Sequence, residues 1–152
     1  MHFKELIMDL IIRKEISMFV DMDGVIASYE IDKPYNFDKK RPLFNNIKIF
    51  EEISKIPGIN LYILSICRED KQIKEKNDWL DKYAPFFKKE NRNILSKETI
   101  VNMSSANIKL KFLKEFECEQ QKILVDDDNM VLKTIKNNLD DVIIFQDSEL
   151  VD

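Results

Sequence analysis

The stretch ISMFVDMDGV, residues 16–25, decides how the rest of the chain is interpreted. Its first half is a compact apolar run of the length of one strand, and Asp21 and Asp23 follow where that strand would end. Gly24 then frees the backbone to turn sharply. Because a turn needs at most one acidic residue, two carboxylates at the exit of an apolar strand indicate a functional site.

The apolar pattern of the whole chain predicts strands that alternate with helices. Apolar runs indicate further strands at residues 59–65, 92–96, 122–125 and 141–145. Helical spacing predicts an N-terminal helix within residues 1–15 and further helices near 47–56, 69–83, 108–116 and 130–139. Strands that are apolar throughout are typical of a parallel sheet with helices on both faces. We therefore expect a single α/β domain, residues 1–152, with a five-stranded parallel sheet.

The composition excludes several classes of site. Two glycines cannot build a glycine-rich nucleotide-binding loop, and the one histidine, His2, argues against Ser-His-Asp catalysis and histidine zinc sites. Cys67 and Cys118 are too far apart for a C-x-x-C motif, and their small number fits a reducing cytoplasm. The formal net charge of −4 argues against an extended nucleic-acid-binding surface. Carboxylates, lysines and hydroxyls must therefore carry the chemistry.

The first 15 residues predict neither a signal peptide nor a membrane span. They carry charges throughout and lack a small-residue cleavage site, and no apolar run in the chain reaches membrane-spanning length. Their apolar residues recur at helical spacing, which predicts an amphipathic helix. Its apolar face either packs on the core or forms a homodimer contact.

Three of the predicted strands end in acidic or hydroxyl side chains. These are Asp21 and Asp23 after the first strand, Ser65 in the second, and Asp126, Asp127 and Asp128 after the fourth. Ligands of open parallel sheets bind outside the carboxyl ends of the strands, so we expect these side chains to meet. Grouped carboxylates raise one another's pKa unless a cation neutralises them, and oxygen ligands suit Mg²⁺. Asp128 alone fits the simpler role of a helix cap.

DMDGV after an apolar strand, a strand-end serine and the late ILVDDD together resemble the haloacid dehalogenase (HAD) superfamily of phosphotransferases. The resemblance spans residues 16–145, and EKNDWLDKYAPFF is most similar to the 5′(3′)-deoxyribonucleotidase-like branch. It implies a Rossmann-like fold and a Mg²⁺-dependent phosphatase. Dehalogenases and transport ATPases of the superfamily lack an acid at the second position, so Asp23 favours hydrolysis of a phosphate ester.

The resemblance also implies a role for each motif residue. Asp21 would be the nucleophile that forms an aspartyl-phosphate, and Asp23 the general acid and then the base. The Asp21 carboxylate, the Asp23 backbone carbonyl and Asp126 would hold Mg²⁺, with Asp127 assisting. Ser65 would donate a hydrogen bond to a phosphoryl oxygen. The cation would offset the repulsion between an anionic nucleophile and an anionic phosphate.

The superfamily also needs a lysine beside the phosphoryl group, for which the chain offers Lys97, Lys109 and Lys111. At about 100° per residue, Lys109 falls on the same helix face as Ile108 and Phe112, whereas Lys111 points away. A lysine on an apolar face is costly unless it meets an acidic cluster, which favours Lys109. Lys97 is the second choice because it directly follows the third predicted strand.

The loop over residues 24–43 is too short for the helical cap that sets substrate choice in typical deoxyribonucleotidases. We expect a small lid, in which Tyr29, Tyr35, Phe37 and Arg41 either contact the substrate or pack the loop onto the body. An uncapped site is open to solvent and admits large substrates, or it needs a partner subunit to close it.

The sequence thus predicts a Mg²⁺-dependent phosphomonoester hydrolase. Its expected substrate is a nucleoside monophosphate or another small phosphate ester. Two alternatives stay open. The missing cap suggests a phosphatase for macromolecular ends such as nucleic-acid 3′-phosphates, and an unsettled lysine leaves room for a HAD-fold binding or regulatory module without turnover.

Overall fold

The computed structural model describes residues 3–29 and 36–150, which form a five-stranded parallel sheet and five α-helices. The strands are β1 (Ile16–Val20), β2 (Ile59–Cys67), β3 (Arg92–Ser96), β4 (Gln121–Asp126) and β5 (Val142–Gln146). The helices are α1 (Phe3–Arg13), α2 (Phe44–Ser54), α3 (Lys71–Tyr83), α4 (Ser105–Glu115) and α5 (Asn129–Asn138), with short 3₁₀ turns η1 (Phe37–Lys39), η2 (Lys89–Asn91) and η3 (Asp147–Glu149). The predicted α/β fold class is confirmed.

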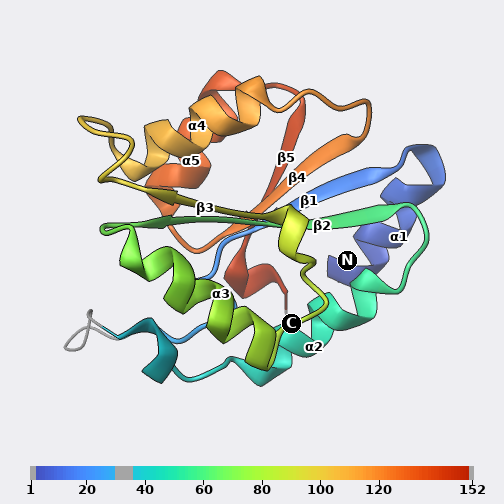
Figure 1. Ribbon diagram of the computed structural model, residues 1–152. Helices are drawn as coiled ribbons and strands as arrows, with labels where there is room; N and C mark the ends of the chain where they lie inside the picture. The colour runs from blue at the N-terminus through green and yellow to red at the C-terminus, as the bar shows by residue number, and fades with distance from the viewer. Residues whose placement is uncertain (1–2, 30–35, 151–152) are drawn as a thin grey trace.

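β1 lies at the centre of the sheet, whose order is β3-β2-β1-β4-β5. It pairs in parallel with β2 on one side and with β4 on the other, and all five of its residues are buried. Helices cover both faces, with α1, α2 and α3 below the sheet and α4 and α5 above it in Figure 1. This two-sided cover explains why the central strand β1 is buried along its whole length.

The core divides into two clusters, one on each face of the sheet. Consecutive residues of β1 belong to different clusters: Met18 to the cluster under α1, α2 and α3, and Phe19 to the cluster under α4 and α5. On α1, Phe3 and Ile7 are buried, and the Phe3 ring meets Phe145 edge-on at 4.9 Å. Core packing therefore accounts for the apolar face of α1, and a homodimer contact through this helix stays a prediction.

At the strand ends, one detail differs from the sequence prediction and another agrees with it. β2 continues to Cys67, two residues past the predicted end at Ser65, because it keeps pairing with β3 after β1 has ended at Val20. Asp128 is the N-cap of α5, where its carboxylate accepts a hydrogen bond from the Met130 amide at 2.8 Å. The capping role expected for Asp128 is confirmed.

The described part of the loop between β1 and α2 contains no helical cap. Phe37 is buried and meets Trp79 of α3 edge-on at 5.8 Å, so it packs the loop onto the body. Tyr29 is 71% exposed, and the Arg41 carbonyl accepts a hydrogen bond from the Ser28 amide at 2.8 Å. Tyr35 lies outside the described residues. Within the described chain, no helix is both long and apolar enough to cross a bilayer.

Candidate active site

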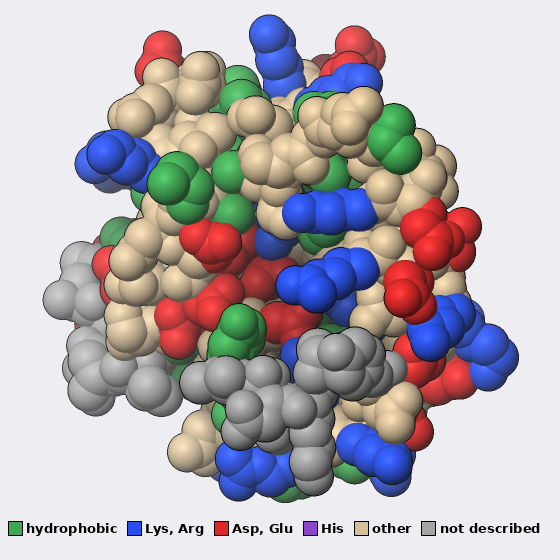
Figure 2. Space-filling model, turned by 90° about the vertical axis from the view of Figure 1, so that its left-hand side faces the viewer, with side chains coloured by type: hydrophobic (Ala, Val, Ile, Leu, Met, Phe, Trp, Pro, Cys, Tyr) green, Lys and Arg blue, Asp and Glu red, His purple; other side chains and the backbone are tan. Residues whose placement is uncertain are grey.

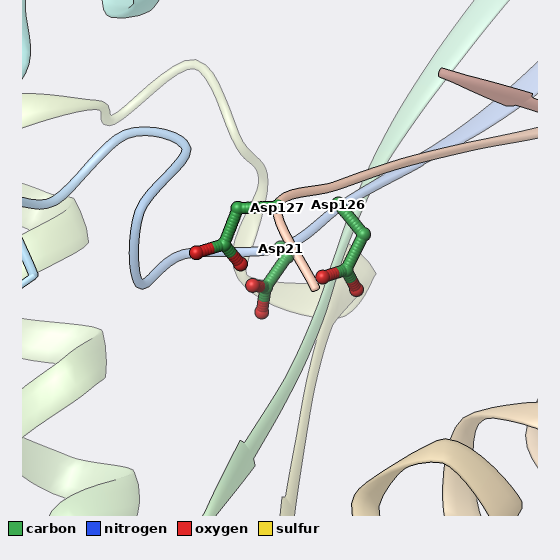
Figure 3. Close-up of side chains that lie close together, drawn as sticks. All are labelled: Asp21, Asp126 and Asp127. Atoms are coloured by element: carbon green, nitrogen blue, oxygen red, sulfur yellow. The ribbon is translucent and has the colours of Figure 1, made fainter. Parts of the chain in front are cut away.

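Three carboxylates meet where β1 and β4 end. Oxygen atoms of Asp21, Asp126 and Asp127 all lie within 4.8 Å of one another, and Figure 3 shows the three carboxyl groups pointing to the same side. Asp21 and Asp126 are buried and Asp127 is half-buried. The Asp21 amide donates to the Val125 carbonyl at 3.0 Å, which extends the pairing of β1 with β4 up to the cluster.

Gly24 permits the close approach of the loop to this cluster. Its φ of +81° lies in the left-handed region, which glycine adopts without the clash of a Cβ. A Cβ at this position would lie 2.0 Å from Oδ2 of Asp127. The glycine is therefore required by both the turn and the neighbouring carboxylate.

Lys109 of α4 is the lysine that reaches the cluster. Its Nζ lies 3.0 Å from Asp21 Oδ1 and 2.6 Å from Asp126 Oδ2, and only 3% of the residue is exposed. Of the other two lysines left open by the sequence, Lys111 is exposed and Lys97 is half-buried. Neither forms an ion pair with a carboxylate in the described chain. Geometry thus places Lys109 beside the predicted nucleophile.

One ammonium group does not neutralise three carboxylates. Burial raises the pKa of Asp21 to about 8 against the opposing effect of Lys109, and the nearby Asp126 and Asp23 raise it further. Burial, followed by the charge of Asp126, raises the pKa of Asp127 to about 6. Burial and like charge thus disfavour ionisation of these carboxylates. A bound Mg²⁺ would stabilise their ionised forms, so the cluster fits a site for this ion.

Asp23 faces a different set of groups. Lys40 Nζ contacts its Oδ1, and Lys76 Nζ lies 3.2 Å from its Oδ2. Burial acts to raise the pKa of Asp23, but the charges of Lys76 and Lys40 outweigh it and lower that pKa below its ordinary value. Asp23 is therefore ionised near neutral pH, whereas burial disfavours the ionised form of metal-free Asp21.

Lys76 connects Asp23 to Ser65. The Lys76 ammonium is almost fully buried and donates to Ser65 Oγ at 2.7 Å and to the Ile66 carbonyl at 3.0 Å. Because the Ser65 oxygen accepts from Lys76, its hydroxyl hydrogen stays available to donate to a ligand. Ser65 is itself fully buried.

A cavity of about 300 Å³ opens over the carboxylates. Its lining residues are Asp21, Asp23, Tyr29, Ile66, Ser105, Lys109, Asp126, Asp127, Asp128 and Val131. Ser65 is not among them, and its neighbour Ile66 stands at the wall instead. Figure 2 views this end of the molecule: Asp and Glu side chains gather at its centre, with Lys and Arg side chains beside them.

Sequence reasoning assigned no role to Lys40 or Lys76. A signal for Lys76 existed, because it precedes Trp79 and Leu80 by three and four residues and so shares the buried face of α3. The argument that favoured Lys109 therefore applies to Lys76 as well. Lys40 offers no such signal, since its contact with Asp23 joins two points of an irregular loop 17 residues apart.

No model of a protein family matches this chain, and no curated protein matches it. Solved structures share its fold. A chain of the Pnkp1/Rnl/Hen1 RNA repair complex superposes with a TM-score of 0.69 over 88% of this chain, at 22% sequence identity. A chain of another structure of the Pnkp1/Rnl/Hen1 complex gives 0.67 over 88%, at 21% identity. This chain spans 42% and 46% of those chains, less than half of their length. Identities this low show the shared fold alone.

Proposed function

We propose that this chain is a Mg²⁺-dependent phosphomonoester hydrolase of the HAD type that acts through Asp21. The observation that carries the proposal is the cluster of Asp21, Asp126 and Asp127 with Lys109 bonded to two of its members. The carboxylates of Asp21 and Asp126 and the Asp23 carbonyl would hold the ion, with Asp127 assisting. When bound, Mg²⁺ lowers the pKa of its carboxylate ligands and offsets the charge of an entering phosphate.

The reaction proceeds in two displacements at phosphorus. An oxygen of Asp21 forms a bond to phosphorus while the bond from phosphorus to the alcohol oxygen breaks. The leaving alcohol oxygen takes a proton from Asp23. Water then attacks the aspartyl-phosphate and gives a proton to Asp23, so that phosphate leaves and both aspartates return to their starting state. Lys109 holds Asp21 in place. Ser65 lies behind the cavity wall and Lys76 already has three acceptors, so the hydrogen bond from Ser65 to a phosphoryl oxygen stays a prediction.

The charge around Asp23 suits both halves of this cycle. Its lowered pKa keeps the resting side chain ionised, as a base for water must be. A phosphate dianion bound beside it adds like charge, which raises the pKa of Asp23 and lets it take up the proton that the leaving alcohol needs.

The cavity favours a small phosphomonoester such as a nucleoside monophosphate. Its volume of about 300 Å³ is at the small end of ligand sites, and the exposed ring of Tyr29 stands at its rim, where a base can stack. A nucleic-acid 3′-phosphate is the second candidate, because the described loop leaves the cavity uncapped and RNA repair complexes contain chains of the same fold.

The location of the protein in a reducing cytoplasm stays a prediction.

Hydrolysis of p-nitrophenyl phosphate tests the proposal. We expect turnover with Mg²⁺, loss of turnover with EDTA, and a fall of at least about 10³-fold for Asp21→Asn. Asp128→Asn is the matched control, because asparagine keeps the helix cap without belonging to the carboxylate cluster. Equal rates in all four arms would show that the proposal is wrong.

The same assay separates the candidate substrates. Deoxynucleoside monophosphates and a 3′-phosphorylated oligonucleotide are compared at equal concentration of phosphate ester. Faster release from the oligonucleotide favours the second candidate. Binding of Mg²⁺ and phosphate without hydrolysis of any ester would favour the binding module instead.

A further inference from the structure

Lys40 reaches the candidate site from the loop and is tied to α3 at the same time. Its ammonium contacts Asp23 Oδ1, and its backbone carbonyl accepts a hydrogen bond from Trp79 Nε1 at 3.0 Å. Both ammonium groups also lie over the Phe37 ring, with that of Lys40 4.9 Å and that of Lys76 5.0 Å from its centroid. We call Phe37, Lys40, Lys76 and Trp79 the Lys40 bracket.

The Lys40 bracket holds both oxygens of the Asp23 carboxylate. Lys76 holds Oδ2 from the buried side, and Lys40 holds Oδ1 from the loop. The Asp23 side chain is 29% exposed, so with one oxygen released it gains room to turn toward solvent. The side chain of Lys40 is only 11% exposed, which means that its ammonium is confined near Asp23 rather than free in water.

We propose that Lys40 is a positioning residue, which fixes the Asp23 carboxylate in the orientation from which it exchanges protons with the leaving group and with water. The proposal rests on the phosphatase function above. The proposal also assigns a role to the short loop, because this loop stands in place of a cap and positions the Lys40 ammonium group at the site. A lysine that only fastened the loop would affect all substrates alike.

The proposed role predicts a dependence on the leaving group. In the first displacement the bond from phosphorus to the leaving oxygen breaks, and an alkyl alcohol oxygen must then take a proton from Asp23. p-Nitrophenolate leaves as a stable anion and needs no such proton. Misorientation of Asp23 therefore slows cleavage of an alkyl phosphate more than cleavage of p-nitrophenyl phosphate.

Single-turnover release of the alcohol, with enzyme in excess over ester, isolates this first displacement. The measured quantity is the ratio of the rate for glycerol 2-phosphate to the rate for p-nitrophenyl phosphate, in the full chain with Mg²⁺. The variants are Lys40→Met, Lys40→Arg, Asp23→Asn and the double variant Lys40→Met/Asp23→Asn. Lys39→Met is the matched control, because Lys39 is an exposed lysine of the same segment.

We expect Lys40→Met to lower the ratio about tenfold, because misorientation forfeits only part of the roughly 10²–10⁴-fold that a complete proton transfer contributes. Asp23→Asn should lower it further, Lys40→Arg should recover much of it, and the double variant should match Asp23→Asn because Lys40 acts through Asp23. Equal losses on both esters, or an additive double variant, would overturn the role of Lys40 alone. A wild-type chain that releases neither alcohol would overturn the phosphatase function and this role together.

Discussion

At the scale of single residues, Lys109 is a buried cation that contacts two carboxylates. It is nearly fully buried between Asp21 and Asp126 and is itself surrounded by the apolar face of α4. Removal of one partner from such a group leaves buried charges without compensation, which typically costs about 3–5 kcal/mol. We therefore expect Lys109→Met to lower the free energy of unfolding by about that amount in EDTA, and to abolish turnover.

Urea unfolding followed by the fluorescence of Trp79 measures this loss, since Trp79 is the one tryptophan of the chain and is buried. Lys111→Met serves as the control, because Lys111 lies on the exposed side of the same helix. Its effect should stay within about 0.5 kcal/mol. Similar losses for both variants would mean that the helix, not the buried ion pairs, responds to the substitution.

The lysines also show what a sequence can predict about a site. Lys109 was identifiable because a helix has a fixed period, so a charged residue on an apolar face must meet opposite charge. Lys40 was not, because an irregular loop has no period from which a side-chain direction follows. Ser65 lies in the second strand, as the sequence predicts, but its burial behind the cavity wall depends on where Lys76 packs.

At the scale of elements, the turn that leaves β1 fixes the distance between the loop and the carboxylates. Gly24→Ala adds a Cβ in a left-handed conformation, at a cost of about 1–2 kcal/mol, and drives it into Asp127. We expect the Mg²⁺ affinity, measured by calorimetric titration, to fall about tenfold, as for a disturbed ligand shell.

Gly58→Ala is a close control for this prediction. Gly58 also has a positive φ, of +88°, but the nearest atom to a Cβ there would be Ile11 Cδ1 at 3.1 Å, away from the carboxylate cluster. It should therefore lower stability without changing the affinity for Mg²⁺. A loss of affinity in both variants would mean that general destabilisation, rather than displacement of Asp127, weakens metal binding.

The order of strands and helices along the chain could be predicted from the sequence. The boundaries of these elements in the structure differ from the predicted ones by up to a few residues. Apolar runs and helical spacing reflect burial, which extends over a whole element, so they predict its presence. Boundaries depend on the neighbour that continues the pairing: β3 prolongs β2 to Cys67, and the Ser104 cap starts α4 at Ser105, before its first long apolar side chain.

At the scale of the whole molecule, the crowded acidic cluster lowers the stability of the metal-free folded state as the pH rises. The pKa values of Asp21 and Asp127 are raised in the folded state, to about 8 and about 6, from ordinary values near 3.8. The folded chain therefore binds protons that the unfolded chain has released, and this contribution to stability is lost as the pH rises from about 4 to about 8. Asp23 has the opposite sign, but its lowered pKa places its effect below that window.

We therefore expect the melting temperature in EDTA to fall by at least about 4 °C between pH 5.5 and pH 8, and Mg²⁺ to restore it at pH 8. Asp127→Asn removes one charge from the cluster, so it should raise the metal-free melting temperature at pH 8 while reducing the gain from Mg²⁺. Asp128→Asn, which keeps its helix cap, should change neither quantity. Two results would contradict the view that this cluster destabilises the protein until a cation binds. One is a melting temperature in EDTA that does not change with pH, and the other is a lower melting temperature for Asp127→Asn.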